Sequence, residues 1–93
     1  MSKVLSFHAD PQHGWLSAPI DEIRTAGLSI TDYSYIDRDA GLAYLEEDRD
    51  AMVYINYLKE KNIPFTVSET HLNHEHPIRR MERWPESWNP SND

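Results

Sequence analysis

The feature that most constrains the fold is an apolar stripe near the middle of the chain. Ala51, Tyr54, Ile55 and Leu58 recur at the spacing of one helix face, within a helix predicted over residues 49–61. A helix of this length gains most of its stability by burying such a face against another element. The stripe therefore requires a partner layer, and a chain of 93 residues has room for one domain of this kind.

Both ends of this helix are marked by local signals. Asp48 is the predicted N-cap, and Asp50 places a further negative charge in the first turn, where the helix dipole favours it. Asn62 suits the left-handed position that ends a helix, and Pro64 prevents the helix from continuing. The helix is therefore expected to be short and sharply bounded.

Segments in which apolar and polar residues alternate supply the partner layer, because alternation is typical of a half-buried strand. Strands are predicted over five ranges, which are 3–9, 15–16, 29–36, 42–47 and 63–69. A shorter helix is predicted between the second and third strands, with Ser17 as its N-cap and Gly27 at its end.

The order strand, strand, helix, strand, strand, helix, strand predicts an α+β fold. We expect a mostly antiparallel sheet of about five strands, with both helices on one face. Residues 37–41 form the predicted hairpin loop between the third and fourth strands. Tyr33, Tyr35 and Tyr44 are then expected to meet as cross-strand pairs. The pattern leaves the strand order open.

The last part of the chain differs from the rest. Residues 71–93 contain histidines, prolines, three arginines and two tryptophans, without periodicity. We therefore assign residues 1–70 to the α+β domain and residues 71–93 to an irregular C-terminal extension. Two arrangements of the extension are open. It stays loose after Pro85, or it packs across the domain through apolar side chains, namely Ile78, Met81 and Trp84.

The net charge of −7, from 16 acidic and 9 basic residues, is concentrated in one segment. Residues 32–50 hold seven of the acidic side chains, whereas Arg38 and Arg49 are the basic ones there. Phosphate contacts need lysine and arginine, so free nucleic acid is a poor partner for this acidic protein. The charge favours a basic protein surface, including one that belongs to a host nucleoprotein complex.

The absence of cysteine from the sequence limits the possible chemistry. It excludes disulfides, cysteine-ligated zinc, iron–sulfur clusters and thiol catalysis. No apolar run is long enough for a signal peptide or a membrane span. We therefore expect a cytoplasmic protein that has no membrane partner and needs no cofactor or metal.

The acidic segment also carries tyrosines, and this combination predicts an interface. Neighbouring carboxylates imitate a row of phosphates, and tyrosine gives contact area at a low entropic cost. The C-terminal arginines are expected to add secondary contacts. The residues predicted to bind the partner are Asp32, Tyr33, Tyr35, Asp37, Asp39, Tyr44, Glu46, Glu47, Asp50, Arg79, Arg80 and Arg83. The alternative interpretation is a solvated face that keeps the protein soluble, with Asp48 and Asp50 serving the helix.

Two groups of residues that contain histidine indicate metal binding or catalysis instead of docking. His71, His74 and His76 supply three imidazoles, which is enough for a zinc site with an open fourth position. The spacing of this group matches no established metal signature, so solvated loop histidines are the alternative. His8 and Asp10 form an acid–base pair if they share one strand face, or they close the first turn.

Five short stretches stand out together. They are Phe7–Pro11, His13–Leu16, Tyr33–Tyr35, Tyr44–Asp48 and Ile78–Arg80. This arrangement, over about residues 7–83, resembles small proteins carried by bacteriophages, prophages and plasmids. Small acidic proteins of such mobile elements often bind and block host defence or nucleic-acid-processing machinery, anti-CRISPR proteins being one type. The resemblance implies this context and assigns no role to any single residue.

Three functions remain in view. The first is a non-enzymatic inhibitor of phage type, which docks its acidic and aromatic surface on a basic host complex such as a CRISPR effector. The second is a metal-binding domain or metal-dependent enzyme that uses His71, His74 and His76. The third is a small homodimeric accessory domain that pairs through an exposed strand edge. We favour the first, because the charge is concentrated and the sequence holds no catalytic motif.

Overall fold

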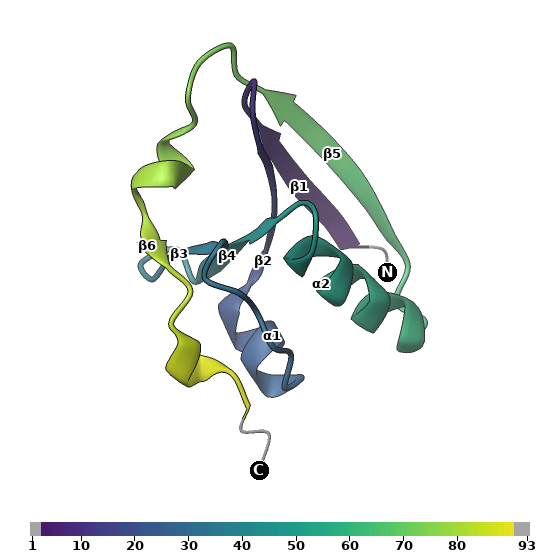
Figure 1. Ribbon diagram of the computed structural model, residues 1–93. Coiled ribbons are helices and arrows are strands. Elements are labelled where there is room, and N and C mark those ends of the chain that lie inside the picture. The colour runs from purple at the N-terminus through teal and green to yellow at the C-terminus, as the bar shows by residue number, and fades with distance from the viewer. Residues whose placement is uncertain (1–2, 91–93) are drawn as a thin grey trace.

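The computed structural model describes residues 3–90, which form a six-stranded sheet with two α-helices and two short 3-10 helices (Figure 1). The strands are β1 (Lys3–Ala9), β2 (Gly14–Pro19), β3 (Tyr35–Asp37), β4 (Leu42–Glu46), β5 (Phe65–His71) and β6 (Glu82–Arg83). The helices are α1 (Ile20–Thr25), α2 (Asp50–Glu60), η1 (Pro77–Arg80) and η2 (Glu86–Trp88). No helix in this part of the chain is long and apolar enough to cross a membrane.

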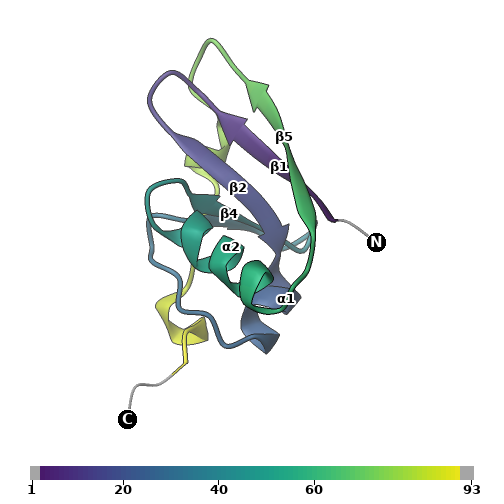
Figure 2. The ribbon, with the colours of Figure 1, turned by 90° about the vertical axis from the view of Figure 1, so that its right-hand side faces the viewer.

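The strands follow the order β5-β1-β2-β4-β3-β6 across the sheet. β1 and β5 run parallel, and the other neighbouring pairs are antiparallel. α2 carries the chain from β4 across the sheet to β5 at the far edge (Figure 2). The α+β class is thus confirmed. The sheet is mixed and has six strands, because the C-terminal segment adds β6 beside β3.

The two α-helices cover one face of the sheet and close the main core. Ile23 of α1 and both Tyr54 and Leu58 of α2 have no exposed area. They belong to one cluster with Leu16 and Leu45, which face each other on β2 and β4. The apolar stripe predicted for the main helix is therefore the helix face that closes the core.

The third predicted strand is much shorter than expected. Residues 29–34 form a turn, and only the last part of the alternating segment pairs with β4. The Asp50 carboxylate of α2 accepts hydrogen bonds from the Thr31 amide and from the Ser34 hydroxyl. These bonds draw the backbone inward, so the alternation of residue types there does not produce a strand.

Both α-helices begin differently from the prediction. Ser17 lies in β2, where its hydroxyl donates to a carbonyl of β1, so Pro19 takes the N-cap position of α1. Before α2, the Glu46 carboxylate accepts two backbone N–H groups, one of them from Asp48, which was the predicted cap. The predicted end of α2 is confirmed, because Asn62 is left-handed with a φ of 56°.

The C-terminal segment covers the other face of the sheet. Trp15 of β2, only 3% exposed, points away from the α-helices. The guanidinium of Arg79, a residue of η1, lies over its ring, 5.7 Å from the indole centre. His76 packs edge-on against His8 of β1, with ring centres 5.5 Å apart. Ile78 of η1 has no exposed area. Packing across the domain, one of the two predicted arrangements, is thus confirmed.

The same segment is anchored a second time in the main core. Trp84 is 1% exposed, and its backbone N–H donates to the Ser34 carbonyl at 2.9 Å. The Asn89 side chain accepts from the Trp84 indole at 2.9 Å and from the Ile30 amide at 2.8 Å. Asn89 also donates to the Ile30 carbonyl at 2.8 Å. The segment after Pro85 is therefore packed, up to the end of the described residues.

Candidate functional site

A groove of about 620 Å³ lies on the sheet face opposite the α-helices, where β2, β3 and β4 meet the C-terminal segment. We call it the aromatic groove. Five of its lining residues, Tyr33, Tyr35, Glu46, Arg79 and Arg83, belong to the predicted partner-binding set. The complete lining is His13, Trp15, Tyr33, Tyr35, Glu46, Asp48, Arg49, Arg79 and Arg83.

Three aromatic side chains give the groove its apolar area. Trp15 is almost fully buried, and the Tyr35 ring lies 6.2 Å from it at an angle of 73°. Tyr33 is 64% exposed in the turn before β3. The predicted cross-strand pair of Tyr35 and Tyr44 is confirmed by the register of β3 and β4. Tyr33 lies outside the strand, so it is free of cross-strand pairing and projects toward solvent.

The three C-terminal arginines lie in different surroundings. Arg83 donates to the Asp32 carbonyl at 2.8 Å, and its guanidinium lies 5.3 Å from the centre of the Tyr35 ring. Arg79 lines the groove too, but its charge is matched by an ion pair with a carboxylate of the first turn. Arg80 is exposed and is not a lining residue of the groove.

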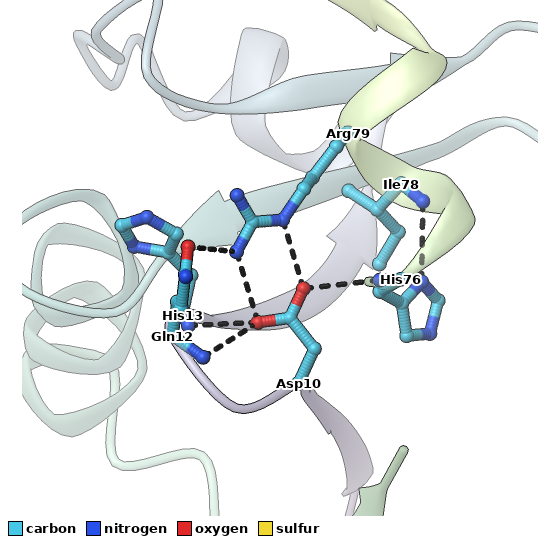
Figure 3. Close-up of polar contacts among 6 residues, drawn as sticks. All are labelled: Asp10, Gln12, His13, His76, Ile78 and Arg79. Atoms are coloured by element: carbon cyan, nitrogen blue, oxygen red, sulfur yellow. Dashed lines mark hydrogen bonds and ion pairs between the residues drawn. The ribbon is translucent and has the colours of Figure 1, made fainter. Parts of the chain in front are cut away.

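Asp10 is the carboxylate that ties the C-terminal segment to the first turn (Figure 3). Its side chain has no exposed area, and Arg79 donates to both of its oxygens, at 2.8 and 3.0 Å. The backbone N–H groups of Gln12, His13 and His76 donate to it as well, at 2.9 to 3.0 Å. The Arg79 hydrogen bonds, with those amides, hold the pKa of Asp10 well below its usual range although burial opposes this.

This geometry makes a prediction about acid stability. We expect Asp10→Asn to lower the free energy of unfolding by about 2 kcal/mol at neutral pH, because hydrogen bonds to a charged group are lost. A depressed pKa in the folded state stabilises the protein above the unfolded pKa of about 4, and this contribution disappears as the pH falls below it. Urea unfolding of both proteins should show the difference shrinking below about pH 4, and a constant difference would contradict the assignment.

The acid–base pair predicted for His8 and Asp10 does not form, since Asp10 is bonded to Arg79. The ring of His8 instead lies edge-on to Tyr44 at 5.6 Å and to His76 at 5.5 Å. Burial, and secondly the charge of His76, lower the pKa of His8, which favours a neutral imidazole. The alternative interpretation, in which Asp10 closes the first turn, is confirmed.

The other predicted histidine cluster is spread over three places. His71 lies in β5, with its Nε2 atom 3.5 Å from Glu69, whereas His74 is exposed in the following connection. His76 is packed on the sheet next to Trp15. In the described part of the chain, no group of three or more histidine, cysteine or acidic side chains is placed to hold a metal ion.

The acidic residues predicted as one surface form two groups at opposite ends of the β3–β4 hairpin. Asp37 and Asp39 lie at its turn, where Asp37 accepts a hydrogen bond from the amide of Ala40. Glu46 and Glu47 lie at the other end, separated from the turn by the length of β4, about 13 Å. Only this second group reaches the aromatic groove, through Glu46.

Asp50 belongs to the interior and is therefore removed from the predicted surface. It is 1% exposed and accepts from the Thr31 amide, from the Thr31 hydroxyl at 2.6 Å and from the Ser34 hydroxyl. Ser34 in turn accepts from the Glu46 amide at 2.9 Å. This network fixes the turn that carries Tyr33 against the start of α2, so Asp50 positions the groove without lining it.

The predicted partner-binding set left out four members of the groove, namely His13, Trp15, Asp48 and Arg49. Trp15 carried a usable signal, because a large aromatic residue opposite Glu46 in the sheet must lie on the same face. That pairing requires the strand order β2-β4, which the sequence left open. Arg49 lies in a segment that was interpreted through its acidic residues, so its own side chain was not considered.

The groove combines aromatic faces with carboxylates and guanidinium groups at its rim, which is the composition of a recognition surface. The Glu46 and Asp48 carboxylates supply hydrogen-bond acceptors on the lining, and the tyrosines offer flat apolar area. Comparison of the chain with protein-family models, with curated proteins and with solved structures found no match. The function is therefore inferred from the geometry of this groove.

Proposed function

We propose that this protein is a non-enzymatic interaction protein that docks the aromatic groove on a basic protein surface. The observation that supports this most is the gathering of Tyr33 and Tyr35 with Glu46 and Asp48 around one groove. Exposed tyrosine at the centre of a patch is typical of a binding hot spot. Tyr33 is 64% exposed, so its ring leaves apolar surface in contact with water in the free protein. A partner would bury that surface.

The charges at the rim favour a basic partner. Asp32 and Asp48 are exposed, Asp32 next to Tyr33 in the chain and Asp48 on the groove lining, and both add to the charge of Glu46. Arg79 is neutralised by its ion pair, and Arg49 and Arg83 balance Glu46 and Asp48 on the lining, so the net negative charge at this rim comes from Asp32. Lysine or arginine side chains of a partner would meet the carboxylates and the faces of the tyrosine rings together.

The resemblance to proteins of bacteriophages, prophages and plasmids suggests the class of partner. We infer a host complex that processes nucleic acid, such as a CRISPR effector, because its nucleic-acid channel is a basic protein surface. The acidic and aromatic surface around the groove would then cover that channel and inhibit the complex in the host cytoplasm. Inhibition by occupancy needs no catalytic residue in the inhibitor.

Charge reversal tests this proposal. A partner is first captured from a host lysate and identified, and its affinity is then measured for the purified chain. We expect the double variant Asp32→Lys, Asp48→Lys to bind at least about tenfold more weakly, because like charges then face the basic surface. Tyr33→Ser should weaken binding by about 30-fold, the effect of a hot spot near 2 kcal/mol.

Matched controls separate docking from net charge. Asp21 and Glu60 are exposed acidic residues on α1 and α2, and reversing both to lysine changes the net charge equally. This control should keep its affinity within about threefold. Equal weakening by both double variants, or binding indifferent to Tyr33→Ser, would reject the aromatic groove as the docking site.

A further inference from the structure

β5 is the outer strand of the sheet and offers a free edge. It pairs with β1 on one side, and no strand of the described chain lies on its other side (Figure 2). Six of its seven residues are exposed, although it is one of the two longest strands. Helix α2 covers only its beginning, where Phe65 packs against the core. The rest of β5 is therefore accessible at its edge and on both faces.

The direction of the backbone groups along this edge follows from its two ends. The Pro64 carbonyl accepts from the Lys3 amide at 3.0 Å, and the Leu72 amide donates to the Ala9 carbonyl at 2.8 Å. Successive residues of a strand point their backbone groups to opposite sides, so the even-numbered residues face β1. The odd-numbered residues therefore present their N–H and C=O groups outward, and these are Phe65, Val67, Glu69 and His71.

This edge lacks the usual protection against strand pairing. Proteins guard long edge strands with lysine, proline or bulges. Residues 65–71 contain no lysine, arginine, aspartate or proline, and Glu69 is the one acidic side chain. Its carboxylate lies 3.5 Å from the imidazole of His71. An unguarded row of alternate donors and acceptors is a template for one more strand.

We propose that this edge pairs with the β5 edge of a second copy of the chain, antiparallel about a twofold axis at Ser68. In this register Phe65 faces His71 of the second copy, and Val67 faces Glu69. All four outward-facing residues of each copy then find partners, so no edge N–H or C=O group between residues 65 and 71 stays unpaired. Two six-stranded sheets become one continuous sheet.

The side chains favour a second copy as the occupant, because the strand complements itself in this register. On the sheet face opposite the α-helices, Thr66 meets Thr70 of the second copy and Ser68 meets its equivalent, which are favourable cross-strand pairs. Glu69 lies opposite Val67, so no like charges face each other. On the helix side, Val67, which is 45% exposed, gains its equivalent as a diagonal neighbour.

Electrostatic repulsion between two acidic copies does not oppose this pairing strongly. The segment that concentrates the negative charge includes β3 and β4, and β4 lies three strands away from β5. Three strand spacings amount to about 14 Å, which exceeds the Debye length of about 8 Å at physiological ionic strength. The inference is independent of the proposed function, because the aromatic groove lies near the edge of the sheet opposite to β5.

Disulfide trapping tests the register directly, since the chain has no native cysteine. Ser68 faces its equivalent as a non-hydrogen-bonded pair, at a Cα separation of about 4.5 Å that a disulfide accepts. Under mild oxidation we expect Ser68→Cys to form a covalent dimer as its main product. Thr66→Cys is the matched control, because its equivalent lies about 13 Å away along the strand. Equal cross-linking of both variants would overturn the register.

The mass of the protein in solution tests the pairing without a cross-link. Light scattering should give twice the chain mass of 10.9 kDa for the wild type and the single-chain mass for Val67→Pro. Proline removes an outward N–H there and leaves the bonds to β1 intact. A wild type of single-chain mass at every concentration, or a dimer that survives Val67→Pro, would refute the proposal. If circular dichroism shows that Val67→Pro is unfolded, Glu69→Pro takes its place.

Discussion

Replacing Trp84 by alanine is expected to lower the free energy of unfolding by about 4 kcal/mol, a large share of what a domain of this size possesses. Trp84 is 1% exposed and belongs to the main core, so the substitution removes buried apolar surface and leaves a cavity. It also removes the indole N–H that Asn89 accepts. Asn89 holds the Ile30 backbone, so the 29–34 turn should loosen as well.

Trp88 provides the control for this prediction. It is only half-buried, and its ring lies edge-on to Trp84 at 5.2 Å. The guanidinium groups of Arg24 and Arg38 lie 4.5 and 4.9 Å from the centre of that ring. Contacts of this kind at the surface contribute roughly 1 kcal/mol, so Trp88→Ala should cost far less than Trp84→Ala. Urea unfolding measures both, and equal losses would mean that the C-terminal segment does not close the core.

The parts of the fold that were predictable are those with local causes. The stripe of Ala51, Tyr54 and Leu58 identified the main helix, because about two turns of consistent spacing between clear end signals leave few other structures. Asn62 marked its end for a similar reason, since few residues accept a left-handed conformation. The pairing of Tyr35 with Tyr44 followed from the short loop between their strands.

The parts that were not predictable depend on contacts between distant residues. Asn89 binds Ile30, 59 residues away, and Asp10 binds Arg79, 69 residues away. Neither contact leaves a period in the sequence, so the C-terminal segment read as irregular. The alternation around Ile30 pointed to a strand, but tertiary hydrogen bonds to Asp50 and Asn89 hold that segment in another conformation.

The candidate site follows the same division. Residue type led to the prediction that Tyr33 and Tyr35 bind a partner, because aromatic side chains beside charges have few structural uses, and both line the groove. Residue type could not distinguish Asp50 from its exposed neighbours, since an acidic residue in the first turn of a helix is already explained by the dipole. Burial separates them, and burial depends on how the 29–34 turn folds over α2.

Replacing Asp50 by alanine should have the second largest effect on the stability of the fold. We expect the free energy of unfolding to fall by about 3 kcal/mol, because the Thr31 amide and two hydroxyl groups lose a charged acceptor inside the protein. Hydrogen exchange should accelerate at the amides of Thr31 and Glu46, which depend on this network. Asp39→Ala, at an exposed position of the hairpin turn, should change stability by less than about 0.5 kcal/mol.

The same variant distinguishes a positioning role for Asp50 from a direct contact with the partner. The Asp50 carboxylate supports the turn that carries Tyr33, so its loss should weaken partner binding although the side chain is buried. The substitution Asp50→Ala disorders this turn and leaves Tyr33 in place. Binding by Asp50→Ala should therefore recover in part when cooling or a stabilising osmolyte restores the turn, whereas binding by Tyr33→Ser should not. Recovery in neither variant would mean that Asp50 acts on the partner by another route. Unchanged affinity in Asp50→Ala, together with accelerated exchange at Thr31, would show that the partner does not use the aromatic groove.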